Sequence, residues 1–335
     1  MGTITVGFEE MQHTFRQALV KTGFTPERAS RLADIMAQNS LDGVVSHGWN
    51  RFLTLIQQIE KGYIQIDAEP ECIASFGAWE QWDGKLGPGP LNATAAAMRA
   101  MELSREHGMG CVGLRNTNHW MRAGTYGQMA AKAGFAMICW TNAKPMMPPY
   151  GSKDVRLGNN PLVFAVPRKD GPVVLDIAMS QFSFGRMEVI ERRGEQLPVP
   201  GGYDQDGQLT QDPTVILESG RALPIGYWKG SGLALLLDMT AALISGGQAT
   251  YQIGQQEAEY NISQVFIAFD VSQPAGAAWV EQQVQQIITD LQRSDPVETG
   301  GEILFPGERV LRTRRENLAN GIPVDETVWQ QILNL

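Results

Sequence analysis

A histidine and an arginine stand four positions apart in the stretch SHGWNRF, residues 46–52. If this stretch is helical, His47 and Arg51 share one face of the helix. A protonated imidazole can give a proton to a developing alkoxide near neutral pH, and a guanidinium matches a carboxylate with two hydrogen bonds. The pair therefore indicates chemistry on a ketone beside a carboxylate. The alternative is an ordinary solvated pair on a helix surface.

A second polar group follows a strand-like run, in RNTNHWMRAGTYG, residues 115–127. Asn116, Asn118 and His119 fall where the expected strand leads into a loop, which is where ligand sites lie in α/β sheets. The alternative is an asparagine-rich turn whose side chains make structural hydrogen bonds.

Two charged residues occupy positions that are unfavourable without a partner. Asp176 stands in the apolar run PVVLDIAMS, where a carboxylate could orient a histidine, bind a ribose or accept backbone N–H groups. Lys229, in GYWKGSG, opens an expected helix, where the helix dipole disfavours a cation. A pyrophosphate bound at that helix terminus would explain the lysine, and simple exposure is the alternative.

Several common site motifs are absent from the chain. It has no G-x-G-x-x-G between a strand and a helix, no G-x-x-x-x-G-K-[ST], no HExxH and no G-x-S-x-G. These absences argue against a Rossmann domain, a P-loop, a zinc protease and an α/β-hydrolase, and we predict no metal site. A nucleotide would have to bind by another mode.

The overall charge limits the partners. The chain has 335 residues and a net charge of −9, and an acidic protein repels nucleic acid unless it carries a basic patch. The densest basic cluster, at 309–315, is offset by neighbouring glutamates, so we expect no nucleic-acid partner. The longest apolar run, GLALLLDMTAALISGG, is too short to span a bilayer and indicates a buried helix, so we expect no membrane partner.

The cysteines and the N-terminus favour the cytoplasm. Cys72, Cys111 and Cys139 are far apart and form no CxxC, which is typical of reduced thiols. The stretch MGTITVGFEEM lacks the basic and apolar regions of a signal peptide.

The elements that must position these groups follow from periodicity and capping signals. Apolar spacing predicts helices from Phe8, from Pro26 with Thr25 as N-cap, and after Ser46 as far as Gly62. After Pro70 short apolar runs predict strands, at 71–76, 110–114, 135–140, 161–166, 172–177 and 263–271. Helices are expected between them, at 91–107, 124–133, 183–193 and 229–245, and again in the last sixty residues, while 197–213 is expected to be a surface loop.

Strands and helices that alternate in this way predict an α/β fold with a mixed sheet. We expect residues 1–70 and 276–335 to form one helical domain built from both chain ends. Residues 71–275 would form a strand-rich α/β domain for cofactor and substrate.

The motifs together resemble a known family. VSHGWNRF, LRNTNHWMRAGTYG, ICWTN, MPPYG, MSQFSFG, GYWKGSG and FPGER run through nearly the whole chain. They resemble the malate/L-lactate dehydrogenase family, which is not Rossmann-folded and includes sulfolactate dehydrogenases. The resemblance implies an NAD(P)-dependent oxidoreductase of 2-oxo acids that works as a homodimer, with NADH as cofactor and NADPH possible.

The same resemblance implies the roles of individual residues. His47 would be the proton donor, and Ser46, Arg51 and His119 would bind the substrate. The cofactor would contact three segments of the chain: Pro172, Val173, Val174, Leu175, Asp176, Ile177 and Ala178; Trp228 and Lys229; and Gly307, Glu308 and Arg309.

The expected substrate is a 2-oxo sugar acid such as 2,3-diketo-L-gulonate. Ala178 and Glu308 depart from the pattern of the family's sugar-acid reductases, which have serine and histidine there. Smaller acids such as pyruvate and oxaloacetate, and cyclic imine carboxylates, therefore stay as alternatives. A non-catalytic sugar-acid sensor with the same fold is the alternative outside enzymes.

Overall fold

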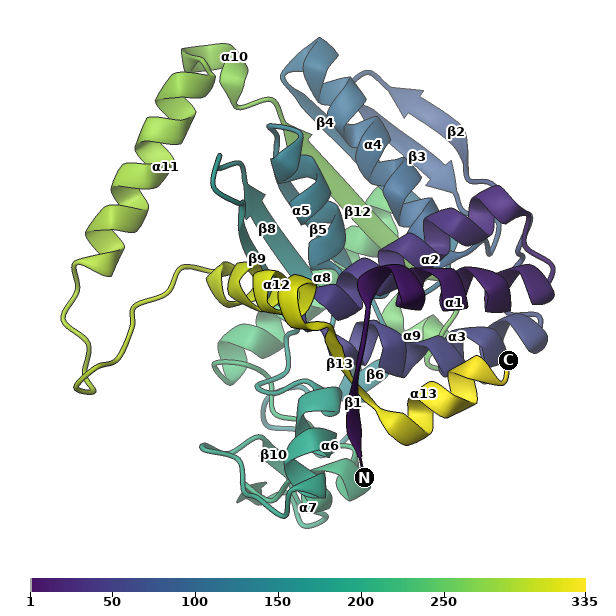
Figure 1. Cartoon of the computed structure of the whole chain (residues 1–335), viewed down its shortest axis with the longest axis vertical. Coiled ribbons are helices and arrows are strands. Elements are labelled where there is room, and N and C mark those ends of the chain that lie inside the picture. The colour runs from purple at the N-terminus through teal and green to yellow at the C-terminus, as the bar shows by residue number, and fades with distance from the viewer. Residues whose placement is uncertain (1) are drawn as a thin grey trace.

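The structure is a computed structural model that describes residues 2–335. Its centre is a seven-stranded sheet with the order β2-β3-β4-β12-β5-β8-β9 (Figure 1). Strands β3 and β4 pair in parallel, and the other neighbours in this sheet pair antiparallel. This mixed pairing confirms the predicted α/β fold with a mixed sheet. The strands are β2 (Glu71–Phe76), β3 (Trp79–Asp83), β4 (Met109–Thr117), β5 (Ala136–Thr141), β8 (Leu162–Val166), β9 (Val173–Ile177) and β12 (Ile262–Phe269).

Six of these strands lie in the apolar runs from which they were predicted. Strand β3 was missed because its sequence, WEQWD, is largely polar. The segment 197–213, predicted as a loop, contains the two-residue strands β10 (Gly202–Tyr203) and β11 (Leu209–Thr210), which pair with each other.

Helices cover both faces of the sheet. Alternate residues of β12 point to opposite sides, as in any strand. Phe266 packs with α4 (Gly89–His107) and α5 (Gly124–Lys132), and Val265 packs on the opposite face with α8 (Trp228–Ser245). A sheet buried on both faces needs continuous apolar strands, which explains why these runs were recognisable in the sequence.

The two ends of the chain pack together in a helical part of the molecule. Strand β1 (Thr3–Val6) pairs with β13 (Ile322–Asp325), and Phe15 contacts both Phe52 and Trp329 with ring centroids 4.2 and 6.2 Å apart. The helices here are α1 (Phe8–Lys21), α2 (Pro26–Leu41), α3 (Trp49–Glu60) and α13 (Glu326–Leu333). The proposed division into 1–70 plus 276–335 and 71–275 stays a prediction.

The predicted start of the third helix is wrong. Residues Val45–His47 form a 3₁₀ turn, and α3 begins at Trp49 after a break at Gly48. Ser40 causes the break, because its hydroxyl accepts the N–H of Trp49 at 2.9 Å and leaves no space for a side chain at Gly48. His47 and Arg51 therefore do not share the face of one helix.

The remaining elements extend from this core. Helix α11 (Ala277–Gln292) stands away from the sheet as an arm (Figure 1). The others are β6 (Pro145–Met147), β7 (Leu157–Gly158), α6 (Phe184–Arg192), α7 (Pro213–Ser219), α9 (Thr250–Ile253), α10 (Ser272–Ala275) and α12 (Glu308–Asn320).

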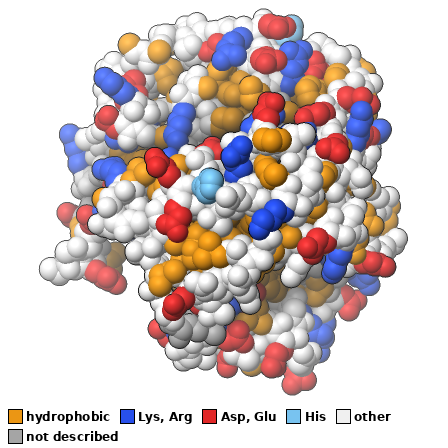
Figure 2. Space-filling model, turned by 45° about the vertical axis from the view of Figure 1, so that its right-hand side comes forward, with side chains coloured by type: hydrophobic (Ala, Val, Ile, Leu, Met, Phe, Trp, Pro, Cys, Tyr) orange, Lys and Arg blue, Asp and Glu red, His pale blue; other side chains and the backbone are white. Residues whose placement is uncertain are grey.

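The surface carries mixed charge on the face that Figure 2 shows, where basic and acidic side chains are interspersed. Within residues 2–335, no helix has the length and apolar character needed to cross a membrane. Over the same range, no three His, Cys, Asp or Glu side chains gather in a way that could hold a metal ion.

A buried carboxylate joins three parts of the chain. Asp42, at the end of α2, is paired with Arg122, which precedes α5, and accepts a hydrogen bond from Arg314 of α12 at 2.7 Å. The side chains of Asp42 and Arg122 are only 1% and 6% exposed. Because both charges are out of water, each depends on the other.

We expect Asp42→Ala to lower the free energy of unfolding by about 3–5 kcal/mol, because it leaves Arg122 buried without its counter-charge. Urea unfolding measures the change. The control is Glu102→Ala, which removes a half-exposed carboxylate paired with Arg99 and should cost less than about 1 kcal/mol. Equal effects of the two substitutions would contradict the role of Asp42.

Candidate active site

The 3₁₀ turn after α2 presents Ser46 and His47 at the junction between the helical part and the sheet. The Ser46 hydroxyl lies 3.0 Å from Nδ1 of His47. The carbonyl of His47 accepts a hydrogen bond from the Asn39 side chain at 3.0 Å, which fixes the turn against α2. Ser46 therefore fixes the imidazole ring of His47, and Asn39 fixes the backbone of the same residue.

A second histidine lies beside it, on the loop that follows β4. The rings of His47 and His119 are nearly parallel, with centroids 5.6 Å apart. Nδ1 of His119 accepts the N–H of Met121 at 3.0 Å, so the ring proton of the neutral form is on Nε2. The loop is anchored by Asn118, whose side-chain amide donates to the carbonyls of Tyr63, Leu86 and Gly87.

Burial and positive charge keep both imidazoles neutral. Burial lowers the pKa of His47 to about 4, helped by the charges of Arg51 and Arg122. Burial also lowers the pKa of His119 well below its usual value, helped by Arg51 and by His47. Arg51 therefore lies close enough to act on both rings, although the helical spacing from which the pairing was predicted is absent.

Two further charged residues, Glu259 and Arg122, belong to this cluster and were not predicted. Glu259, on the loop before β12, lies with Oε1 3.9 Å from Nε2 of His119, and its Oε2 accepts the N–H of Lys144 at 2.9 Å. Burial raises the pKa of Glu259. Arg122 was within the recognised motif NHWMRAG, whereas Glu259 stands in an acidic stretch with no pattern that could have identified it.

A cavity of about 290 Å³ lies next to this cluster, between β9 and the start of α12. Asp176 lines it and accepts the N–H of Gly124 at 2.8 Å, with Nε of Arg122 3.9 Å away. Burial raises the pKa of Asp176, and Arg122 opposes that rise. Of the three roles considered for the Asp176 carboxylate, the structure shows the one in which it accepts a backbone N–H group. The other lining residues are Val44, Arg122, Gln128, Pro172, Val174, Leu175, Pro306, Gly307, Val310 and Leu311.

The structure brings together two of the three segments predicted to bind the cofactor. Gly307 has a φ of +92°, and the N–H of Val174 donates to the carbonyl of Pro306 at 3.0 Å, so α12 starts directly against β9. The first N–H groups of a helix favour an anion there. Pro172, Val174, Leu175, Asp176 and Gly307 line the cavity, whereas Val173, Ile177, Ala178, Glu308 and Arg309 do not.

The third segment lies elsewhere. Trp228 and Lys229 open α8, are exposed, and line neither this cavity nor the next. The backbone just before them is tied to the end of β9, because the N–H of Ile225 donates to the carbonyl of Met179 at 2.8 Å. They are therefore neighbours of β9 without being part of the cavity.

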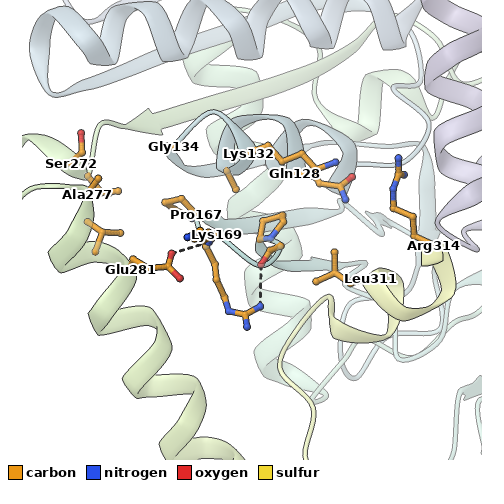
Figure 3. Close-up of a pocket in the computed structure, with 16 residues that line it drawn as sticks. Gln128, Lys132, Gly134, Pro167, Lys169, Ser272, Ala277, Glu281, Leu311 and Arg314 are labelled. Carbon is orange, nitrogen blue, oxygen red and sulfur yellow. Dashed lines mark hydrogen bonds between the residues drawn. The ribbon is translucent and has the colours of Figure 1, made fainter. Parts of the chain in front are cut away.

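A larger cavity of about 490 Å³ adjoins the first and reaches the arm α11 (Figure 3). The two share Gln128, Pro172 and Leu311, so they lie side by side, and together they are called the cleft below. Aliphatic walls suit the flat rings of a dinucleotide, and the start of a helix suits its pyrophosphate. The larger cavity, called the outer cavity below, adds the basic side chains of Lys132, Arg168 and Arg314. These residues fit an extended dinucleotide whose inner end lies near Asp176.

Known proteins resemble this chain over its whole length. The model of the malate/L-lactate dehydrogenase family matches residues 6–333. A 2,3-diketo-L-gulonate reductase of Citrobacter koseri is 44% identical over 329 residues, which cover 98% of each chain. The malate dehydrogenase structure from Entamoeba histolytica superposes with a TM-score of 0.94 at 25% identity, covering 100% of this chain and 99% of the other. A Δ1-piperideine-2-carboxylate reductase structure from Pseudomonas syringae has a TM-score of 0.85 at 26% identity, covering 99% of each chain.

Proposed function

The chain belongs to the malate/L-lactate dehydrogenase family, as its motifs predicted, and from that membership we propose that it reduces a 2-oxo acid. The protein is an oxidoreductase, and the proposal names a 2-oxo sugar acid such as 2,3-diketo-L-gulonate as its substrate. The observation that carries it is the stacking of His47 on His119, under the charge of Arg51 on the next helix, beside a cleft lined by Val44 and Arg122.

Arg51 binds the substrate carboxylate in this proposal. Its charge acts on His47, His119 and Glu259, so it belongs to the same cluster. A bidentate contact to the carboxylate would fix the adjacent ketone in one orientation. The ketone oxygen would then face His47.

His47 gives the proton to that oxygen. In the free protein its pKa of about 4 leaves it neutral at pH 7. The substrate carboxylate neutralises Arg51, which is one of the charges that lower this pKa, and negative charge on the ketone oxygen favours the imidazolium further. Substrate binding is therefore coupled to proton uptake by His47.

The reduced nicotinamide, when bound, supplies the hydride to the ketone carbon. The role of the protein is to hold the two reactants in place and to exclude water from the site. His119 and Glu259 add polar groups beside His47, which suit the hydroxyl groups of a sugar acid.

The direct test is oxidation of NADH and NADPH, followed by absorbance, with a panel of substrates. The panel holds 2,3-diketo-L-gulonate, pyruvate, oxaloacetate and Δ1-piperideine-2-carboxylate, and we expect the sugar acid to have the highest kcat/KM.

We expect His47→Ala to lower kcat by about 10²–10⁴-fold and Arg51→Ala to raise KM. His107→Ala, an exposed histidine on α4, is the control. If the wild type turns over no member of the substrate panel, the result favours a non-catalytic sugar-acid sensor. If it prefers Δ1-piperideine-2-carboxylate, the protein is a reductase of cyclic imine carboxylates.

Between pH 6 and 8 the rate of reduction should depend on pH, and the rate of oxidation should not. Because the pKa of free His47 is lowered to about 4, the protonated form needed for reduction is lost as pH rises. We expect kcat/KM for reduction to fall about tenfold per unit between pH 6 and 8. Oxidation of the 2-hydroxy acid needs neutral His47 and should be flat over this range. A flat profile for reduction would contradict His47 as the donor.

We also propose a cytoplasmic homodimer. Its support is the outer face of α8, where Leu236 and Leu243 are 58% and 76% exposed, because apolar surface of this kind is typical of an interface. The three cysteines are free thiols, in keeping with a reducing compartment.

Light scattering tests the dimer. We expect the wild type to have twice the chain mass and the double variant Leu236→Lys, Leu243→Lys to be monomeric, because two lysines cannot be buried there without partners. Leu209→Lys changes another exposed leucine, on β11, and should leave the dimer intact. A monomeric wild type would exclude the proposed assembly.

A further inference from the structure

The outer cavity is unusual in its charge. Four basic side chains line it, Lys132, Arg168, Lys169 and Arg314, together with one carboxylate, Glu281 (Figure 3). The chain as a whole carries a net charge of −9, so this concentration of cations is local. A cavity with this charge favours a ligand with more than one negative charge.

Most of these charges already have partners. Arg314 donates to Asp42 and to the side chain of Gln38 at 2.7 and 2.6 Å. Glu281 accepts the backbone N–H of Lys169 at 2.8 Å, and the Arg168 guanidinium donates to the carbonyls of Asp170 and Gly171. These contacts fix the walls of the cavity.

The two lysines differ from the two arginines, because among residues 2–335 the ammonium groups of Lys132 and Lys169 have no hydrogen bond or ion pair. Both side chains are exposed, and Lys132 is distinguished by its place in the cleft. It lies at the end of α5, one turn beyond Gln128, at the point where the two cavities join. Partial burial and the nearby charge of Arg314 lower its pKa and Asp42 opposes that fall, so an anion there would offset the repulsion from Arg314.

The opposite wall is apolar. Ala277 and Val280 of the arm α11 face Pro167, Pro172 and Leu311 across the cavity. A planar base can pack between such surfaces. The cavity therefore combines a place for a base with a free cation beside it.

We propose that the outer cavity takes the 2′-phosphorylated adenosine end of NADPH, with Lys132 binding the 2′-phosphate, so that the enzyme prefers NADPH to NADH. The inference rests on the proposed function, because it assumes that the cleft holds the dinucleotide. The pyrophosphate has its own place at the start of α12, beside Gly307, so the charges further out are available for an additional phosphate.

Isothermal titration calorimetry tests this without catalysis. The probes are NADPH, NADH, 2′,5′-ADP and 5′-AMP, each added to the full-length protein. We expect NADPH and 2′,5′-ADP to bind about tenfold or more tightly than NADH and 5′-AMP. Lys132→Glu should weaken NADPH binding by about 10–100-fold and leave NADH within about twofold.

Lys21→Glu is the matched control, because it makes the same charge change at an exposed lysine on α1 outside the cavity, and it should alter neither affinity. Equal wild-type affinity for the two dinucleotides, tighter binding of NADH, or equal weakening of both by Lys132→Glu would overturn the inference while leaving the proposed function standing. Failure of folded wild type to bind either dinucleotide would instead overturn the proposed function.

Discussion

The carboxylate of Asp42 is the interaction on which the arrangement of the site depends. It holds Arg122 and Arg314, which come from the loop before α5 and from α12, while Asp42 itself ends α2. The other side of Arg122 faces Asp176, and its charge helps to lower the pKa of His47. Arg314 lines the outer cavity. One buried ion network therefore fixes the chain segments and also sets the electrostatics of the candidate site.

This network gives the two ends of the cleft a common physical character. Near His47 the fixed charges are Arg51 and Arg122, and further out Lys132 and Arg168 take their place. Both histidines are held neutral, so they do not add to this positive charge until an anion arrives. An anionic acid and a polyphosphate cofactor are both favoured by such a field.

The sequence predicted most of the fold because the sheet is buried on both faces, so its strands are apolar runs. It missed β3 because polar residues fill that strand, and it misplaced the start of α3 because a tertiary contact from Ser40 sets the break at Gly48. The motifs identified His47, Arg51 and His119. Glu259 and Lys132 could not be found, because their significance comes from neighbours over a hundred positions away in the chain, such as His119 and Arg314.

The way each side chain of the candidate site is anchored indicates which end of the substrate the site would discriminate more strictly. His47 is fixed through Asn39 and Ser46, and Arg51 lies on a regular helix, so the proposed recognition of a 2-oxo carboxylate would rest on rigid elements. His119 and Glu259 lie on loops, and the 3.9 Å between them is too long for a hydrogen bond. A hydroxyl placed between them could accept from one and donate to the other. Under the proposed function, the helix and turn that carry Arg51 and His47 would specify the reaction, and the loops that carry His119 and Glu259 are where relatives with different substrates could differ.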